Sequence, residues 1–149
     1  MKNLLYLLII IVFAMACNKD KYTTKPQLEF KKINGNVFPK NSELKMVLNV
    51  TDKEGDLTDT LFIYKLNKNC MKDTLKLFYK MPTFPTNTNL QTELLVNYTY
   101  GINGIYPSIT LSSKCNGNQN DTCTFKFIIK DKAGNKSDSV VSPQLVLLK

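Results

Sequence analysis

Two acidic turns carry the side chains best suited to hold a metal ion. The first turn contains Asp52, Glu54 and Asp56, and the second contains Asp131 and Asn135. Carboxylate and amide oxygens are the ligands that Ca²⁺ prefers, and this ion takes about six to eight of them. We therefore interpret these five residues as a candidate calcium site, on the condition that the fold brings the two turns together.

The same turns also fit a simpler interpretation. Their spacing is not that of an EF-hand loop, because Gly55 stands at the fourth position from Asp52 instead of the sixth. Lys53 and Lys132 also weaken the negative field. In a plain connecting turn, glycine is present because it adopts positive φ without steric cost. The sequence alone leaves both interpretations open.

Three cysteines follow the N-terminal region: Cys70, Cys115 and Cys123. In an oxidising compartment they permit one disulfide and leave one thiol. Cys115 and Cys123 flank a short polar loop, so we predict a disulfide between these two. A bridge from Cys70 to either of the others is the alternative. A catalytic thiol is not expected, because the chain has no histidine that could lower its pKa.

The residue types that are missing exclude much chemistry. The chain has no His and no Trp, and all 20 of its basic residues are Lys. Without His, the Ser-His-Asp and Cys-His nucleophiles and imidazole zinc sites cannot be built. Without Arg, the commonest specific contact to guanine is missing. We predict a protein that is not an enzyme and does not bind nucleic acid. A hydrolase that uses only carboxylates, Asp52 or Asp56 among them, is a remote alternative.

The N-terminus indicates export and anchoring. Residues 4–16 are uninterrupted apolar or aromatic residues after Lys2. As a helix they would span only about 20 Å, less than the ~30 Å hydrocarbon core, which is typical of a signal peptide at residues 1–16. Ala14-Met15-Ala16-Cys17 resembles the bacterial lipobox. The resemblance implies that Cys17 is lipidated, becomes the first mature residue and holds the protein on a membrane.

Residues 17–26 are polar and end in Pro26, so we expect a flexible tether. Lysines in this segment can lie against anionic head groups. The net charge of +8 is spread along the chain and favours weak contact with anionic lipid or polysaccharide. The expected location is the cell envelope, on the outer membrane, at its periplasmic face or at the cell surface.

From residue 27 onward the dominant hydrophobic period is two. In residues 42–50, for example, Leu44, Met46 and Leu48 alternate with polar or smaller neighbours, as in a half-buried strand. Pro143 predicts a break or an edge position in the last run. Seven such runs, separated by turns, predict an all-β, immunoglobulin-like antiparallel sandwich of about seven strands over residues 27–149. The runs are 28–33, 42–50, 60–66, 75–80, 92–100, 123–130 and 139–148.

The segments 52–57, 121–127 and 131–138 carry a family resemblance. Together they resemble a group of small uncharacterised Bacteroidetes lipoproteins with an Ig-like domain. The resemblance implies that fold and an envelope location, and it supplies no activity. Three triplets that begin at Asp59, Asp73 and Asp138 are similar to the O-glycosylation acceptor of exported Bacteroidetes proteins. They make Thr60, Thr74 and Ser139 candidate modification sites.

The immunoglobulin-type arrangement decides where the acidic turns lie. If residues 42–50, 60–66, 123–130 and 139–148 are strands B, C, F and G, the B–C and F–G loops share one end of the sandwich. We therefore predict a non-enzymatic, membrane-anchored envelope lipoprotein whose Ig-like domain binds a protein or glycan partner or acts as a structural spacer. The alternative is a calcium-dependent adhesion module in which these two loops hold the cation.

Overall fold

The structure is a computed structural model that describes residues 21–149 except 71–74, 84, 86 and 102–108. The proposed signal peptide, Cys17 and Thr74 lie outside the described residues. Within the described part of the chain, all regular secondary structure is β-strand. No helix there is long and apolar enough to cross a bilayer.

All seven predicted runs are strands in the structure. The last run is divided into β9 and β10 around Pro143, as that proline predicted, and the short strands β2 and β7 were not predicted. The described strands are β1 (Gln27–Ile33), β2 (Val37–Phe38), β3 (Ser42–Asp52), β4 (Thr60–Asn67), β5 (Leu75–Lys80), β6 (Leu90–Tyr100), β7 (Ile109–Leu111), β8 (Asp121–Lys130), β9 (Val140–Val141) and β10 (Leu145–Leu147).

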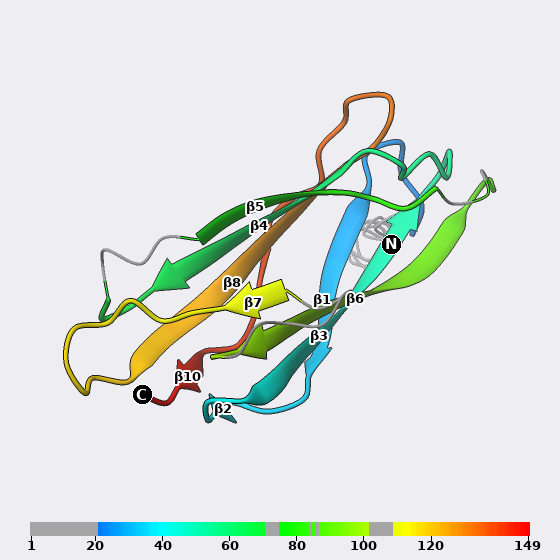
Figure 1. Cartoon of the computed structure of the whole chain (residues 1–149). Helices are drawn as coiled ribbons and strands as arrows, with labels where there is room; N and C mark the ends of the chain where they lie inside the picture. The colour runs from blue at the N-terminus through cyan, green and yellow to red at the C-terminus, as the bar shows by residue number, and fades with distance from the viewer. Residues whose placement is uncertain (1–20, 71–74, 84, 86, 102–108) are drawn as a thin grey trace, which may run out of the picture.

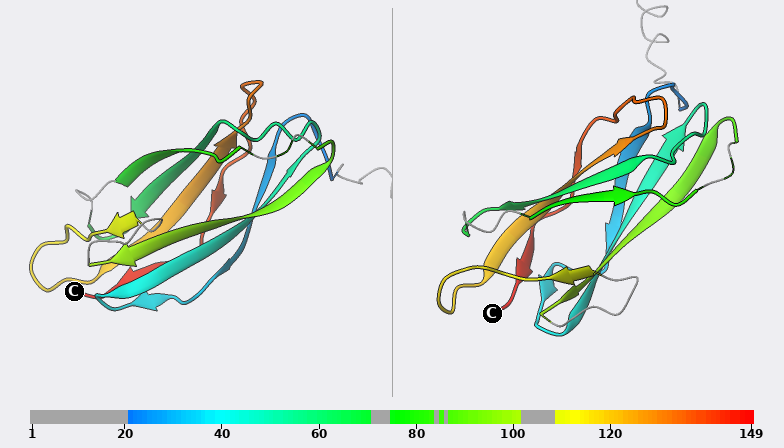
Figure 2. Two further views of the ribbon diagram at one scale, coloured as in Figure 1. Left: turned by 45° about the vertical axis from the view of Figure 1, so that its right-hand side comes forward. Right: turned by 45° about the horizontal axis from the view of Figure 1, so that its top comes forward.

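The strands form two sheets that lie face to face (Figures 1 and 2). One sheet has the order β1-β3-β6-β7, and the other has the order β2-β10-β8-β4-β5, with β9 also paired to β8. Neighbouring described strands are antiparallel apart from the pairs β2–β10 and β6–β7, which are parallel. The predicted all-β sandwich is therefore confirmed.

The strand order can be compared with the immunoglobulin pattern. The orders β1-β3-β6 and β10-β8-β4 correspond to A-B-E and G-F-C of that pattern. β7 differs, because it follows β6 in the chain and pairs with it in parallel, whereas strand D of the pattern precedes strand E. The two-sheet sandwich is established, and the immunoglobulin-like subtype stays a prediction.

The core lies between the sheets and is filled by alternate residues of the long strands. Leu44, Met46 and Leu48 of β3 are fully buried, as the period of two requires. Tyr98 of β6 stacks on Phe125 of β8 across the sandwich, with ring centroids 5.5 Å apart. All buried core residues lie between Phe38 and Leu147, and side chains of β1 pack against them. The chain from residue 27 onward thus contains its whole described core.

The register places the acidic turns together. Gln27 pairs with Thr51, and Thr60 pairs with Lys130, so β1 and β4 begin where β3 and β8 end. We call this the acidic end. At the opposite end, β8 begins beside the last residues of β4 and β10, and the C-terminus lies there (Figure 1). We call this the disulfide end, because Cys70 and Cys115 lie there.

Candidate functional site

Three of the five predicted metal ligands converge at the acidic end. Asp52, Asp56 and Asp131 each offer a carboxylate oxygen, and these oxygens all lie within 4.8 Å of one another. Asp52 is the last residue of β3, and Asp131 directly follows β8. Both are buried, and Asp56 is partly exposed. The two turns therefore meet, as the sandwich topology predicted.

Asp52 has one satisfied oxygen and one buried oxygen without a partner. Its Oδ2 accepts hydrogen bonds from the backbone N–H groups of Gly55 (2.6 Å) and Asp56 (3.1 Å), which close the turn. Its Oδ1 is buried and has no hydrogen-bond partner. Burial raises the pKa of Asp52 above the usual value, as do the carboxylates of Asp56 and Glu54, against the two hydrogen bonds. A buried carboxylate oxygen without a partner is costly, and a cation would compensate it.

Asn135 fixes Asp131 within the second turn. Its backbone N–H donates to Oδ1 of Asp131 (2.7 Å), and its side-chain Nδ2 donates to Oδ2 (2.9 Å). The backbone N–H of Lys132 then donates to the carbonyl oxygen of Asp56 (3.0 Å), which joins the two turns. The amide nitrogen of Asn135 thus positions one carboxylate of the cluster.

The conformation of the first turn requires glycine. Gly55 has a φ of 70°, and a Cβ at this position would lie 2.1 Å from the carbonyl oxygen of Asn87. The backbone N–H of Asn89 donates to the carbonyl oxygen of Lys53 (2.8 Å), so residues 87–89 lie against the turn. Neither the φ nor the close approach tolerates a side chain. The turn is therefore held in place by its surroundings.

Glu54, the remaining predicted ligand, lies outside the three-carboxylate cluster. It is exposed, and its Oε1 accepts a hydrogen bond from the Thr24 hydroxyl at 3.1 Å. This bond is one of several between residues 23–25 and the two turns. The others are Lys53 N–H to Thr23 O (3.2 Å), Asn135 Nδ2 to Thr24 O (3.5 Å) and Lys25 Nζ to Asp138 Oδ1 (2.6 Å). Residues 23–25, which we expected to be part of a flexible tether, are thus attached to the domain.

The carboxylate cluster has dimensions that suit calcium. A point among three oxygens no more than 4.8 Å apart lies within about 2.8 Å of each of them, close to the Ca²⁺–oxygen distances of about 2.3–2.6 Å. Asp52, Asp56 and Asp131 are therefore the residues that could hold Ca²⁺.

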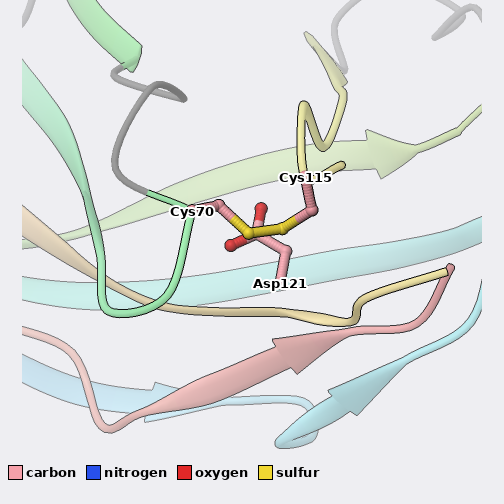
Figure 3. Close-up of side chains that lie close together, drawn as sticks. All are labelled: Cys70, Cys115 and Asp121. Atoms are coloured by element: carbon pink, nitrogen blue, oxygen red, sulfur yellow. A yellow bond between two sulfur atoms is a disulfide. The ribbon is translucent and has the colours of Figure 1, made fainter. Parts of the chain in front are cut away.

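The predicted disulfide between Cys115 and Cys123 is wrong. Cys70 is bonded to Cys115, with their Cα atoms 5.1 Å apart, and Cys123 is buried and takes no part in this disulfide. Cys123 lies inside β8, opposite Asn67 in β4, and its side chain belongs to the core between the sheets. Cys115 precedes β8 and lies instead beside the connection that follows β4, where Cys70 is found (Figure 3). Proximity in space, set by strand pairing, overrides proximity in sequence.

A buried ion pair next to this disulfide was missed by the sequence analysis. Lys65 Nζ lies 2.5 Å from Asp121 Oδ2, and both side chains are 0% exposed. Oδ1 of Asp121 is buried without a hydrogen-bond partner, and its carboxylate lies close to the disulfide sulfurs (Figure 3). The signal was present, because Lys65 continues the inward-facing series of Leu61 and Ile63. Sulfurs in a disulfide are not thiolate ligands, so this second cluster is not a metal site.

The candidate modification sites differ in accessibility. Thr60, the first residue of β4, is partly exposed, and its hydroxyl donates to Asp59 Oδ1 at 2.8 Å. Ser139 is exposed just before β9. Thr74 lies outside the described residues, so the structure places two of the three. Glycosylation of these residues stays a prediction.

Comparisons with known proteins add a distant structural likeness. No protein-family model and no curated protein sequence matches the chain. Among solved structures, the chain is similar to the sporulation control protein Spo0M from Bacillus subtilis. The two share 6% identity with a TM-score of 0.47, and the match covers 85% of this chain and 51% of that chain. The chain thus spans about half the length of Spo0M, and a likeness this distant carries no functional conclusion.

Proposed function

We propose that this protein is a lipid-anchored envelope protein whose β-sandwich binds Ca²⁺ through Asp52, Asp56 and Asp131. The observation that carries the proposal is the convergence of these three carboxylates, one of which has a buried oxygen without a hydrogen-bond partner. The Ala-Met-Ala-Cys sequence before residue 18 supports anchoring through Cys17. In this function, the cation orders the loops of a non-enzymatic binding module.

The geometry favours calcium binding over a purely structural spacer. Solvated connecting turns would keep their carboxylates in water, whereas Asp52 is 0% exposed and Asp131 is 1% exposed. The negative charges of carboxylates held close together in such a site repel one another, which destabilises their ionised forms. A divalent cation would offset both the burial and the repulsion, so the arrangement is most stable with an ion bound.

Thermal unfolding tests the calcium site. Binding to the folded state alone should raise its unfolding free energy by about 2.7 kcal/mol at a Ca²⁺ concentration 100 times Kd. The triple variant Asp52→Asn, Asp56→Asn, Asp131→Asn should keep its fold, because asparagine still offers an oxygen acceptor for the turn N–H groups. It should lose the stabilisation by Ca²⁺.

Asp138→Asn is the matched control for this experiment. Asp138 lies at the same end, and its side chain is 90% exposed and outside the cluster. This variant should keep the full Ca²⁺ response. Equal shifts in the wild type and the triple variant would contradict the proposed site.

The anchor has a separate test. Mass spectrometry of the membrane fraction from a Bacteroidetes host should find a mature chain that begins at Cys17 and carries acyl mass. Cys17→Ser should release the protein from the membrane. Soluble wild-type protein cut at another position would contradict the anchoring part of the proposal.

A further inference from the structure

The chain enters the domain at its acidic end. Thr23 O accepts a hydrogen bond from the N–H of Lys53, next to Asp52 of the carboxylate cluster. Only five residues lie between Cys17 and Thr23, and an extended chain from one to the other reaches about 20 Å. With Cys17 in the bilayer, the acidic end is therefore held close to the lipid head groups, at a high effective concentration. The disulfide end lies at the opposite end of the sandwich, where the C-terminus is found (Figure 2).

The charge of the acidic end depends on the cation. The three segments 21–25, 52–56 and 131–138 contain five lysines, all exposed, and five carboxylates. Their formal charges cancel in the absence of metal, and one Ca²⁺ makes the acidic end positive by two. The lysines are Lys21, Lys25, Lys53, Lys132 and Lys136. Calcium would thus convert a neutral end into one that attracts anionic surfaces.

The cluster also leaves room for ligands from outside the protein. With one oxygen from each carboxylate, the cluster supplies three of the about six to eight oxygens that Ca²⁺ takes, and other ligands complete its coordination. Asp52 and Asp131 are buried, so further ligands must approach beside Asp56, which is partly exposed. Phosphate oxygens are hard, negatively charged ligands of the kind that Ca²⁺ prefers.

We propose that the Ca²⁺-loaded acidic end binds the phosphate groups of anionic phospholipids, and that the domain thereby docks onto the membrane that carries its anchor. The inference rests on the proposed function, because it needs both the calcium site and the anchor at Cys17. It assigns the acidic end to the membrane and leaves the disulfide end as the face presented to the surroundings.

Vesicle binding without the lipid anchor tests this docking. The chain from Asn18 to Lys149 contains the whole described core and lacks the lipidated cysteine. It is mixed with vesicles of phosphatidylcholine, or of phosphatidylcholine and phosphatidylglycerol in equal amounts, in Ca²⁺ or in chelator. We expect sedimentation only with the anionic vesicles in Ca²⁺. By linkage, those vesicles should lower the Ca²⁺ concentration at half-saturation by about tenfold.

The controls separate this inference from the proposed function. Vesicle binding by Asp138→Asn should depend on Ca²⁺ like that of the wild type. The triple Asp→Asn variant has three fewer negative charges and no cation site, so any vesicle binding it shows should be the same in Ca²⁺ and in chelator. A normal thermal shift by Ca²⁺ without vesicle binding would overturn the docking and leave the calcium site standing. Equal vesicle binding in chelator would show attraction by lysines alone and would overturn the role of the cation. Loss of both the thermal shift and vesicle binding would overturn both proposals.

Discussion

Replacing Asp121 with Asn should be among the most destabilising single changes in this protein. The substitution keeps the shape of the side chain and removes the negative charge opposite Lys65, at a site where both side chains are 0% exposed. Breaking a buried ion pair from one side costs about 3–5 kcal/mol, because the charge that remains is still buried and has lost the attraction of the removed charge. Since whole domains are stable by about 5–15 kcal/mol, Asp121→Asn should remove about a fifth or more of the total.

Urea denaturation at neutral pH measures the effect, with the m-value checked for a constant two-state transition. The double variant Lys65→Met, Asp121→Val provides the contrast. Because Oδ1 of Asp121 already lacks a hydrogen-bond partner, the pair is incompletely satisfied, and removing both charges should restore stability to within about 1 kcal/mol of the wild type. A loss below about 1 kcal/mol for Asp121→Asn, or a double variant as unstable as the single one, would refute this reasoning.

Three further predictions concern the disulfide, the turns and the buried carboxylate. Replacing both Cys70 and Cys115 with Ser should lower the free energy of unfolding by about 4 kcal/mol, because the bond closes a loop with a sequence separation of 45. Non-reducing peptide mapping of the wild type should recover Cys70 joined to Cys115, and any other pairing contradicts the structure. Gly55→Ala should cost about 3 kcal/mol and Gly134→Ala about 1 kcal/mol in urea titrations, because both have positive φ but only Gly55 meets a neighbouring backbone. In chelator, the unfolding free energy of the wild type should fall relative to that of Asp52→Asn as the pH rises from about 3.8 through the raised pKa of Asp52. The reason is that the folded state holds the proton on Asp52 more tightly than the unfolded chain does. Parallel pH profiles of the two proteins would count against the burial of this carboxylate.

The alternation of apolar residues was sufficient to predict the main strands and the sandwich. It worked because each long strand buries one face, as Leu44 and Met46 show in β3. The meeting of Asp52 and Asp131 followed from the topology, since Asp52 ends β3, Asp131 directly follows β8, and the two strands finish at the same end. The strands β2 and β7 have only two and three residues, too few to show a hydrophobic period, and they were therefore not predicted.

The errors arose where pairing between distant segments decides the outcome. Cys115 lies nearer in sequence to Cys123 than to Cys70, yet the inward phase of β8 buries Cys123 between the sheets. Lys65 was passed over because a lysine within a strand is usually taken to face water, although it stands in phase with buried Ile63. Strand phase, applied to polar residues as strictly as to apolar ones, would have revealed the ion pair.

The parallel pairing of β2 with β10 has a mechanical consequence. The N–H of Val146 donates to Asn36 O (2.8 Å) and the N–H of Leu148 donates to Phe38 O (2.9 Å), so the last strand is bonded to the segment that follows β1. If the protein is anchored at its N-terminus, as proposed, and a partner binds the opposite end, a force between the two acts along the strands. A force along the strands is shared by all the hydrogen bonds between two neighbouring strands, so these bonds must break together. A force perpendicular to the strands would instead break the same hydrogen bonds one at a time.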